Sequence, residues 1–412
     1  MSKKPNRWVV LVSSMGILMC TGAIYAFSVL AGPLSETNGW TMGEVMTAFA
    51  INAALGPIPM VLGGFLTDKG WSKWSIMAGA VLFGAGFALT GTATSLFQLY
   101  LYYGVLAGFG QGFAYSGCLS NTIRFFPDKK GLASGLITAG MGGAAIIAAP
   151  IANQLIQNKG VGTAFVWMGI AYILIGFTCS LFIKVAPKQI TSSKANVKQN
   201  QALQVKVVSK NWKEMLQSIN FYLILLMFAT GAFSGLMIAS NAAAIGQSTF
   251  GLTAATAAFY VSLYSLSNTL GRVVWGTISD KLGQSTTITI IYSIIALMFV
   301  ILILIQTTLG FAIGIIGLGL CFGGVMGVFP SLVMDNFGPK FQGVNYGIVF
   351  IGYSTAAFIA PKVSAAISVS NNGDYTKAFY VAIAVVIMGL VLNIFYNKKT
   401  TNVRIAKTLV DQ

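Results

Sequence analysis

The sequence predicts an all-α membrane protein with twelve transmembrane helices in two parallel six-helix repeats. Of its 412 residues, 56% are hydrophobic and only 8% are charged, whereas about 25% of the residues of a soluble domain are charged. The apolar residues form runs of about 20 residues, the length that crosses a bilayer. Two motifs also recur along the chain at one constant spacing. Together these observations exclude an ordinary soluble protein.

The apolar runs form two groups of six. They lie at about residues 8–34, 43–66, 75–96, 97–123, 131–156 and 161–183, and then at 218–246, 254–278, 286–307, 310–334, 343–369 and 377–396. Between the groups, the segment from Lys184 to Lys213 contains seven lysines with Ser, Gln and Asn, a composition typical of a linker. We therefore expect a first half at 1–183, a linker with a short surface helix at 184–217, a second half at 218–397 and a tail at 398–412.

Two motifs indicate that the halves repeat each other. The segment from Gly64 to Lys69 resembles the segment from Gly276 to Lys281, and Asp68 and Asp280 within them are 212 positions apart. A second set matches at the same offset, with Phe125, Gly131 and Gly135 corresponding to Phe337, Gly343 and Gly347. Two motifs with one offset indicate parallel structural repeats. Because Asp68 and Asp280 fall at helix ends, we expect them to cap helices and lock an outward-open state, which is a gating role.

The charge distribution predicts the orientation in the membrane. The chain has 25 Lys and Arg against 9 Asp and Glu, a net charge of +16, which in a soluble chain would suggest a nucleic-acid partner. Here the basic residues cluster between apolar runs, and nearly all lie on one side if both termini and the linker are cytoplasmic. The basic N-terminus leads into a long apolar run and is interpreted as a first helix, not a signal peptide. We expect a multi-pass protein of the inner (plasma) membrane with both termini cytoplasmic, in contact with lipid and not with nucleic acid.

Metal, disulfide and enzymatic chemistry are not expected. The chain has no His, and Cys20, Cys118, Cys179 and Cys321 lie in apolar runs without CxxC spacing, as is typical of small buried side chains. No Gly-Lys-Ser/Thr loop supports the use of ATP. An enzyme would need a catalytic set of acids, His or metal ligands in the membrane core. We therefore expect no cofactor, no metal site and no enzyme activity, and a monomer.

Arg272 is the main candidate for a functional residue. It lies eight residues before Asp280, which places it roughly 12 Å deep in a core about 30 Å thick. A buried Arg there costs at least about 2.5–3.5 kcal/mol, so it should face a wet cavity and an anion. All nine acids map to loops, span ends or termini, and a substrate carboxylate would match the guanidinium. The alternative is a structural tie in which helix C-terminal carbonyls accept its hydrogen bonds.

Several neutral residues share this depth and could complete a binding site. Asn268 and Tyr264 lie one and two turns before Arg272 on the same helix face. Tyr115 and Tyr353 are predicted about 14 and 15 Å deep, and Tyr25 about 26 Å from Trp8, at the outer side of a cavity. Each tyrosine could donate a hydroxyl to an anion, although packing alone is the alternative for each. The last three candidates form a possible apolar wall: Phe322, Met326 and Phe350.

The motifs resemble those of the major facilitator superfamily, and within it those of the oxalate/formate antiporter family, the bacterial relatives of the monocarboxylate transporters. The resemblance rests on the run from Arg124 to Gly135 and on Asn268, Gly271 and Arg272 ahead of Gly276 to Lys281. Three further segments agree with it: Glu214-Met215-Leu216, Phe329-Pro330-Ser331 and Asn345-Tyr346-Gly347. The resemblance covers essentially the whole chain. It implies alternating access, in which two halves rock about a central site for small organic anions.

The resemblance also narrows the substrate. Family members that exchange oxalate carry a Lys at the position that aligns with Tyr353, and this sequence lacks it. Two carboxylates in a low dielectric need two cations, so one Arg favours a monocarboxylate such as lactate, pyruvate or formate. The alternatives are an oxalate/formate type of dicarboxylate exchanger and a carrier of another solute on the same fold.

The absence of an acidic residue at the depth of Arg272 predicts how transport is coupled to an energy source. Animal monocarboxylate carriers place an Asp where this chain has Asn268, and proton symporters usually bury a group that titrates. We therefore expect either exchange against a counter-anion or transport in which a proton travels with the substrate. Glu36 or Asp335 could still couple a proton at the periphery.

Overall fold

The structure is a computed structural model that describes residues 6–186 and 209–410, with side chains up to residue 399. Every regular element in these residues is a helix. The elements of the first half are α1 (Arg7–Thr21), η1 (Gly22–Ala26), α2 (Phe27–Asn38), α3 (Met42–Leu55), α4 (Pro57–Leu66), η2 (Thr67–Trp71), α5 (Ser72–Thr90), α6 (Leu96–Leu99), η3 (Tyr100–Ala107), α7 (Gly108–Ile123), α8 (Lys130–Gly142), α9 (Ala144–Lys159) and α10 (Val161–Phe182). Those of the rest of the chain are α11 (Trp212–Leu216), α12 (Ile219–Ser248), α13 (Ala254–Leu282), α14 (Gln284–Leu304), α15 (Thr308–Phe337), α16 (Gln342–Ser370) and α17 (Thr376–Val410).

The prediction of an all-helical chain with apolar spanning helices is confirmed. Nine helical stretches of the described residues are long and apolar enough to cross a membrane. One of them joins α4 to α5 across Gly70, whose φ of +95° turns the chain between two predicted spans. The predicted spans that contain α7 and α13 fall outside the nine, because these helices are rich in Gly, Ser, Thr and Asn. Polar helices of this kind are expected next to a wet site and not next to lipid.

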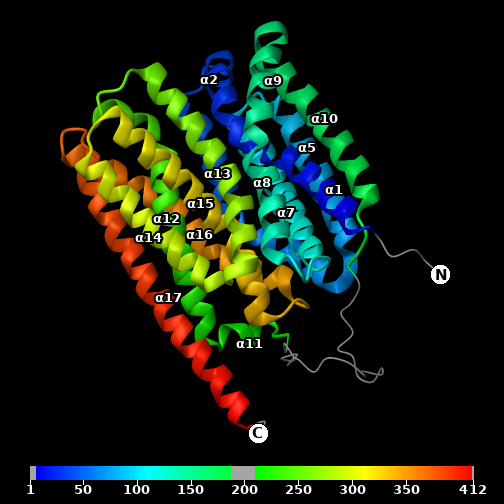
Figure 1. Ribbon diagram of the computed structural model, residues 1–412. Coiled ribbons are helices and arrows are strands. Elements are labelled where there is room, and N and C mark those ends of the chain that lie inside the picture. The colour runs from blue at the N-terminus through cyan, green and yellow to red at the C-terminus, as the bar shows by residue number, and fades with distance from the viewer. Residues whose placement is uncertain (1–5, 187–208, 411–412) are drawn as a thin grey trace.

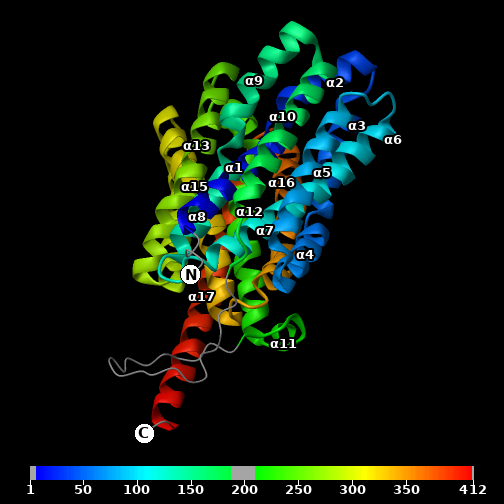
Figure 2. The same cartoon turned by 90° about the vertical axis from the view of Figure 1, so that its right-hand side faces the viewer.

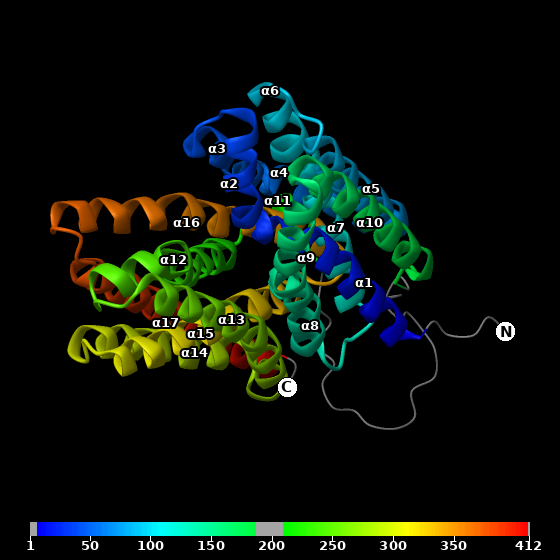
Figure 3. The ribbon, with the colours of Figure 1, turned by 90° about the horizontal axis from the view of Figure 1, so that it is seen from above.

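Two helical bundles lie side by side, one built from α1–α10 and the other from α12–α17 (Figures 1 and 3). Their helices approach each other at the side where α1 begins and α17 ends, here named the termini side. Toward the opposite side, the far side, the ribbons of the two bundles separate (Figure 1). Figure 2 shows α2, α3, α9 and α10 extending along the first bundle to the far side.

Glycines allow the close approach on the termini side. A Cβ at Gly64 of α4 would lie 2.3 Å from the carbonyl carbon of Gly343 in α16, and one at Gly131 of α8 would lie 2.1 Å from the carbonyl oxygen of Gly276 in α13. These four glycines belong to the repeated motifs, so the two contacts are related by the 212-residue offset. Any side chain at these positions would push the bundles apart.

The first half also contains two helix breaks that touch each other. The first predicted span is divided by the 3₁₀ turn η1, and the fifth is divided between α8 and α9 at Gly143. A Cβ at Gly22, the first residue of η1, would lie 2.3 Å from the carbonyl oxygen of Met141. The breaks are therefore packed directly against one another.

The predicted linker and tail differ from the structure in detail. The predicted short surface helix corresponds to α11, whereas residues 187–208 lie outside the described residues. The N–H of Lys210 donates to the Phe337 carbonyl at 2.9 Å, which attaches the end of the linker to α15. The last helix, α17, continues to Val410 and does not end near residue 396, because the segment after it contains no Pro or Gly to stop a helix.

Candidate functional site

Arg272 lies on α13 where the second bundle faces α8 of the first. Its side chain is buried, with 4% of its surface exposed. Nε donates to the Asn268 side-chain oxygen at 3.1 Å, and Nη1 donates to the backbone carbonyl of Thr138 at 2.7 Å. The first bond keeps the guanidinium along α13, and the second joins the two halves.

The end of α8 provides the acceptor for Arg272. The C-terminal end of a helix carries partial negative charge, and Thr138 lies one turn before α8 ends at Gly142. A backbone carbonyl oxygen has two lone pairs, so it can accept from Arg272 in addition to a helical N–H. Gly142 also makes room, because a Cβ there would lie 3.0 Å from the Arg272 Cζ atom. The structural tie considered in the sequence analysis is therefore present in this conformation.

The hydrogen bonds to Asn268 and Thr138 do not use all the donors of the Arg272 guanidinium. Nη2 of Arg272 has no hydrogen-bond partner among the described residues, and none of their ion pairs involves Arg272. A cation with an unused donor and no carboxylate remains able to bind an anion. The structure thus retains both features, a carbonyl tie and a free face of the guanidinium.

An aromatic group spans the two halves near Arg272. The ring of Phe350 on α16 is 5.9 Å from that of Tyr115 on α7 and 4.6 Å from that of Tyr353. The hydroxyls of Tyr115 and Tyr346 are buried and interact with each other, with no other side chain or backbone group of the described residues as a hydrogen-bond partner. The structure therefore brings Tyr115, Tyr353 and Phe350 together.

Tyr346 is a residue that sequence reasoning missed. It lies only three residues after Gly343, so counting depth along the helix placed it close to the surface. The usable signal was its spacing from Tyr353, since positions seven apart share one helix face. Its side chain is only 1% exposed, and its ring centroid is 6.0 Å from that of Phe350.

The remaining predicted site residues have other surroundings. The prediction that Tyr264 offers its hydroxyl to an anion does not hold in this conformation, because that hydroxyl donates to the Gly235 carbonyl at 2.7 Å within the second half. Phe322 packs against the same Gly235, and Met326 is buried beside it on α15. Tyr25 lies in η1 with 39% of its surface exposed, and its hydroxyl interacts with that of Tyr353.

Asp68 and Asp280 each cap a helix of the opposite half. Asp68 accepts the N–H groups of Gly343 and Val344 at 3.0 and 2.9 Å, at the start of α16. Asp280 accepts those of Gly131 and Leu132, at the start of α8. Carboxylates are favourable at helix N-termini because unpaired N–H groups and the helix dipole point toward them. We call these two interactions the α16 contact and the α8 contact.

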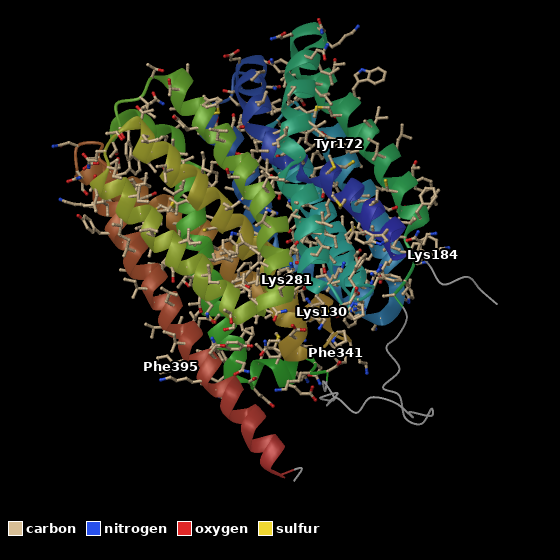
Figure 4. The ribbon with its side chains drawn as sticks, viewed as in Figure 1. Lys130, Tyr172, Lys184, Lys281, Phe341 and Phe395 are labelled. Carbon is tan, nitrogen blue, oxygen red and sulfur yellow. The ribbon has the colours of Figure 1, made fainter. Side chains whose placement is uncertain are left out.

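The two contacts differ in charge although they share geometry. Arg124 donates to Asp68 in the α16 contact, and both side chains are largely buried. The residue 212 positions after Arg124 is Asn336, which bonds to the Leu332 carbonyl and to Tyr396. Near the α8 contact, Lys130 instead pairs with Asp335 across the halves. Figure 4 shows Lys130, Lys281 and Phe341 together on this side of the molecule.

Comparisons with known proteins agree with this architecture. The model of the Major Facilitator Superfamily matches residues 12–361. The oxalate:formate antiporter of Oxalobacter formigenes is 32% identical over 389 residues, covering 91% of this chain and 88% of that protein. Human monocarboxylate transporter 12 is 23% identical over 404 residues, covering 90% of this chain and 77% of that protein.

Solved structures share the fold at lower sequence identity. The transporter FucP in its outward conformation superposes with a TM-score of 0.71 at 17% identity, covering 94% of this chain and 98% of that one. The human organic anion transporter MFSD10 superposes with a TM-score of 0.73 at 11% identity, covering 95% and 100%. The predicted fold of two six-helix repeats is the fold of these proteins.

Proposed function

The chain belongs to the Major Facilitator Superfamily, and on this premise we propose that it is a secondary active transporter of short monocarboxylates, of the lactate, pyruvate and formate class. Its relatives are transporters and not enzymes. The observation that carries the proposal is Arg272, a buried cation between the halves that has an unused Nη2 donor and no carboxylate partner among the described residues. A substrate carboxylate supplies the missing charge.

The aromatic group supports a small substrate with one charge. Tyr353, at the position that aligns with the Lys of oxalate exchangers, packs against Phe350, and Tyr115 and Tyr346 add two buried hydroxyls that interact with each other. Phenol hydroxyls stabilise an anion by hydrogen bonding but do not neutralise a second charge. Asn268, Tyr25, Phe322 and Met326 complete the proposed lining.

A second candidate function is exchange of a dicarboxylate. It is favoured by the similarity to the oxalate:formate antiporter, whose name gives oxalate and formate as the exchanged anions. The difference between the candidates is the number of charges that the site must bind, so the two make opposite predictions for oxalate.

The site lies on the contact between the halves, which suits alternating access. In the proposed cycle the present arrangement is outward-facing, with the termini side cytoplasmic and held closed by Asp68 and Asp280. A carboxylate that binds Nη2 lowers the net charge of the guanidinium and weakens its bond to the Thr138 carbonyl, which frees α8 to move relative to α13. The protein then acts as a monomer in the inner (plasma) membrane.

Coupling in this proposal does not use a protein carboxylate at the site. Arg272 is surrounded by Asn268, a backbone carbonyl and tyrosines, none of which changes charge near neutral pH. Transport is therefore either exchange against a counter-anion or movement of a proton with the substrate.

Counterflow in proteoliposomes tests the function. Liposomes with purified protein and loaded with one unlabelled anion are mixed with labelled lactate, pyruvate, formate, acetate or oxalate, and uptake is compared with protein-free liposomes. We expect labelled monocarboxylates to accumulate transiently. Oxalate as the preferred substrate would select the dicarboxylate exchanger, and no counterflow with any carboxylate would reject both candidates.

A further inference from the structure

A surface crevice lies between the termini-side ends of α1 and α10. It has a volume of about 220 Å³ and is lined by Asn6, Val9, Val10, Leu181, Phe182 and Lys184. The two helices pack tightly farther along, where a Cβ at Gly16 would lie 3.1 Å from the Cys179 sulfur. The crevice therefore begins where that packing ends, and its floor is apolar.

The walls of the crevice face outward from the protein. Val9, Leu181 and Phe182 are 43%, 47% and 55% exposed, whereas Val10 at the floor is only 1% exposed. Exposed apolar side chains on a spanning helix contact lipid chains. Trp8 at the start of α1 and Trp74 near the start of α5 are also exposed, and Trp is enriched at the interface between lipid chains and headgroups. The crevice thus opens at headgroup level.

Two lysines lie at the crevice, and neither is paired with a carboxylate of the described residues. Lys184 lines it and is exposed. Lys73, the second residue of α5, donates from Nζ to the Leu181 carbonyl at 3.4 Å, which places its ammonium at the crevice wall. Neither lysine forms an ion pair within the described residues, in contrast to Arg7, whose Nη1 is paired with Asp128 at 2.6 Å.

The position of Lys184 is fixed by the fold. The Asn121 side chain donates to the Lys184 carbonyl and accepts from the Ala186 N–H, each at 2.9 Å. Asn121 is itself fully buried, so it holds the backbone after α10 in one conformation. Because its backbone is fixed at the crevice, Lys184 loses only the freedom of its side chain when it binds a ligand.

We propose that the α1–α10 crevice is a binding site for an anionic phospholipid of the adjacent leaflet. The acyl chain lies against Val9, Leu181 and Phe182, and the phosphate is bound by Lys73 and Lys184. Basic pockets between membrane helices bind anionic headgroups in this way. The proposal is independent of the transported substrate, because the crevice lies on the outer surface of the first half.

Lipid retention by the full-length protein tests the proposal without a transport measurement. The protein is reconstituted with mixed phosphatidylglycerol and phosphatidylcholine, and retained lipids are counted by native mass spectrometry. We expect one phosphatidylglycerol to be retained in preference to phosphatidylcholine. The double variant Lys73→Gln/Lys184→Gln should weaken this binding by about 30-fold, as expected for two surface cations.

Matched variants separate a local site from general charge attraction. Lys129→Gln/Lys281→Gln removes two exposed lysines of the same side outside the crevice and should retain the lipid. Val9→Trp keeps both lysines but fills the crevice, and should weaken phosphatidylglycerol binding while the melting temperature in phosphatidylcholine stays unchanged. Equal retention of the two lipids by the wild type, equal losses in the two lysine double variants, or displacement of the lipid by inorganic phosphate would overturn the proposal.

Discussion

Replacing Asp68 and Asp280 one at a time should reveal how unequal the two helix contacts are. Asp68 accepts two N–H groups of α16 and is paired with Arg124. Asp280 accepts two N–H groups of α8 and has no cation partner among the described residues. We therefore expect Asp68→Asn to open the termini side more than Asp280→Asn does.

The magnitudes follow from the surroundings of each carboxylate. Asp280→Asn removes a charge from a helix N-terminus, which costs about 0.3–2 kcal/mol, while an amide oxygen can still accept one N–H. Asp68→Asn removes a similar interaction and also leaves Arg124 unpaired, which costs about 3–5 kcal/mol when a pair is fully buried. Because the Arg124 side chain is 14% exposed, we expect Asp68→Asn to destabilise the closed state by about 3 kcal/mol in total. The closed state should lose roughly 150-fold in population for Asp68→Asn and roughly fivefold for Asp280→Asn.

Electron–electron distance measurements on spin labels can test this order. Labels at positions 129 and 281 report the separation of the halves on the termini side, since both lysines are exposed and lie on opposite halves, in a background that lacks the four native cysteines. Asp128→Asn is the control, because Arg7 lies in the same half and, by hydrogen bonding, lowers the pKa of the Asp128 carboxyl. The reasoning is refuted if Asp280→Asn broadens the distances more than Asp68→Asn, or if the control shifts them as much.

Three further predictions concern the site. Arg272→Gln should reduce counterflow by about 100-fold or more, since charge-assisted bonds contribute about 1.5–3 kcal/mol each, and Arg272→Lys should retain little; near-normal transport by the Gln variant would remove Arg272 from the site. Tyr353→Lys should shift competition toward oxalate, and an unchanged order of inhibitors would contradict the single-cation argument. Gly142→Ala should weaken substrate affinity by up to about tenfold, because the added methyl group displaces the Arg272 guanidinium. The control Gly43→Ala, whose methyl group meets open space, should leave the affinity unchanged. Equal effects of the two variants would show that the contact between Gly142 and Arg272 is unimportant.

The large features of the fold could be read from the chain because they depend on composition and spacing. Runs of apolar residues predicted the spanning helices, and the offset of 212 positions predicted the repeat. The same offset relates the α16 contact to the α8 contact, so the motifs that revealed the repeat are the residues that join the halves. Counting residues along one helix placed Arg272 at depth in the membrane, and this placement stays a prediction.

The partners of Arg272 and Tyr264 could not be predicted in the same way. The acceptor of the Arg272 Nη1 donor is the Thr138 carbonyl, one turn before the end of α8. Every residue has a backbone carbonyl, so no residue type in the sequence marks this one as the partner. Tyr264 shares a face with Arg272, but its long side chain reaches the Gly235 carbonyl on α12. Periodicity in the sequence predicts the helix face on which a residue lies. The hydrogen-bond partner of its side chain depends on how the neighbouring helices pack.

The exchange of helix caps between the halves makes each half dependent on the other. The first turn of α8 is capped by Asp280 and the first turn of α16 by Asp68, so separating the halves would leave both helix starts with unpaired N–H groups. Two copies of the first half could reproduce only the Asp68 interaction. The second half has Asn336 and Asp335, whereas the first half has different residues, Arg124 and Ile123, at the positions 212 earlier. A substitution at Gly131 or Gly343 is therefore constrained by residues encoded more than 140 positions away, and the two repeats must accumulate sequence changes as a matched pair.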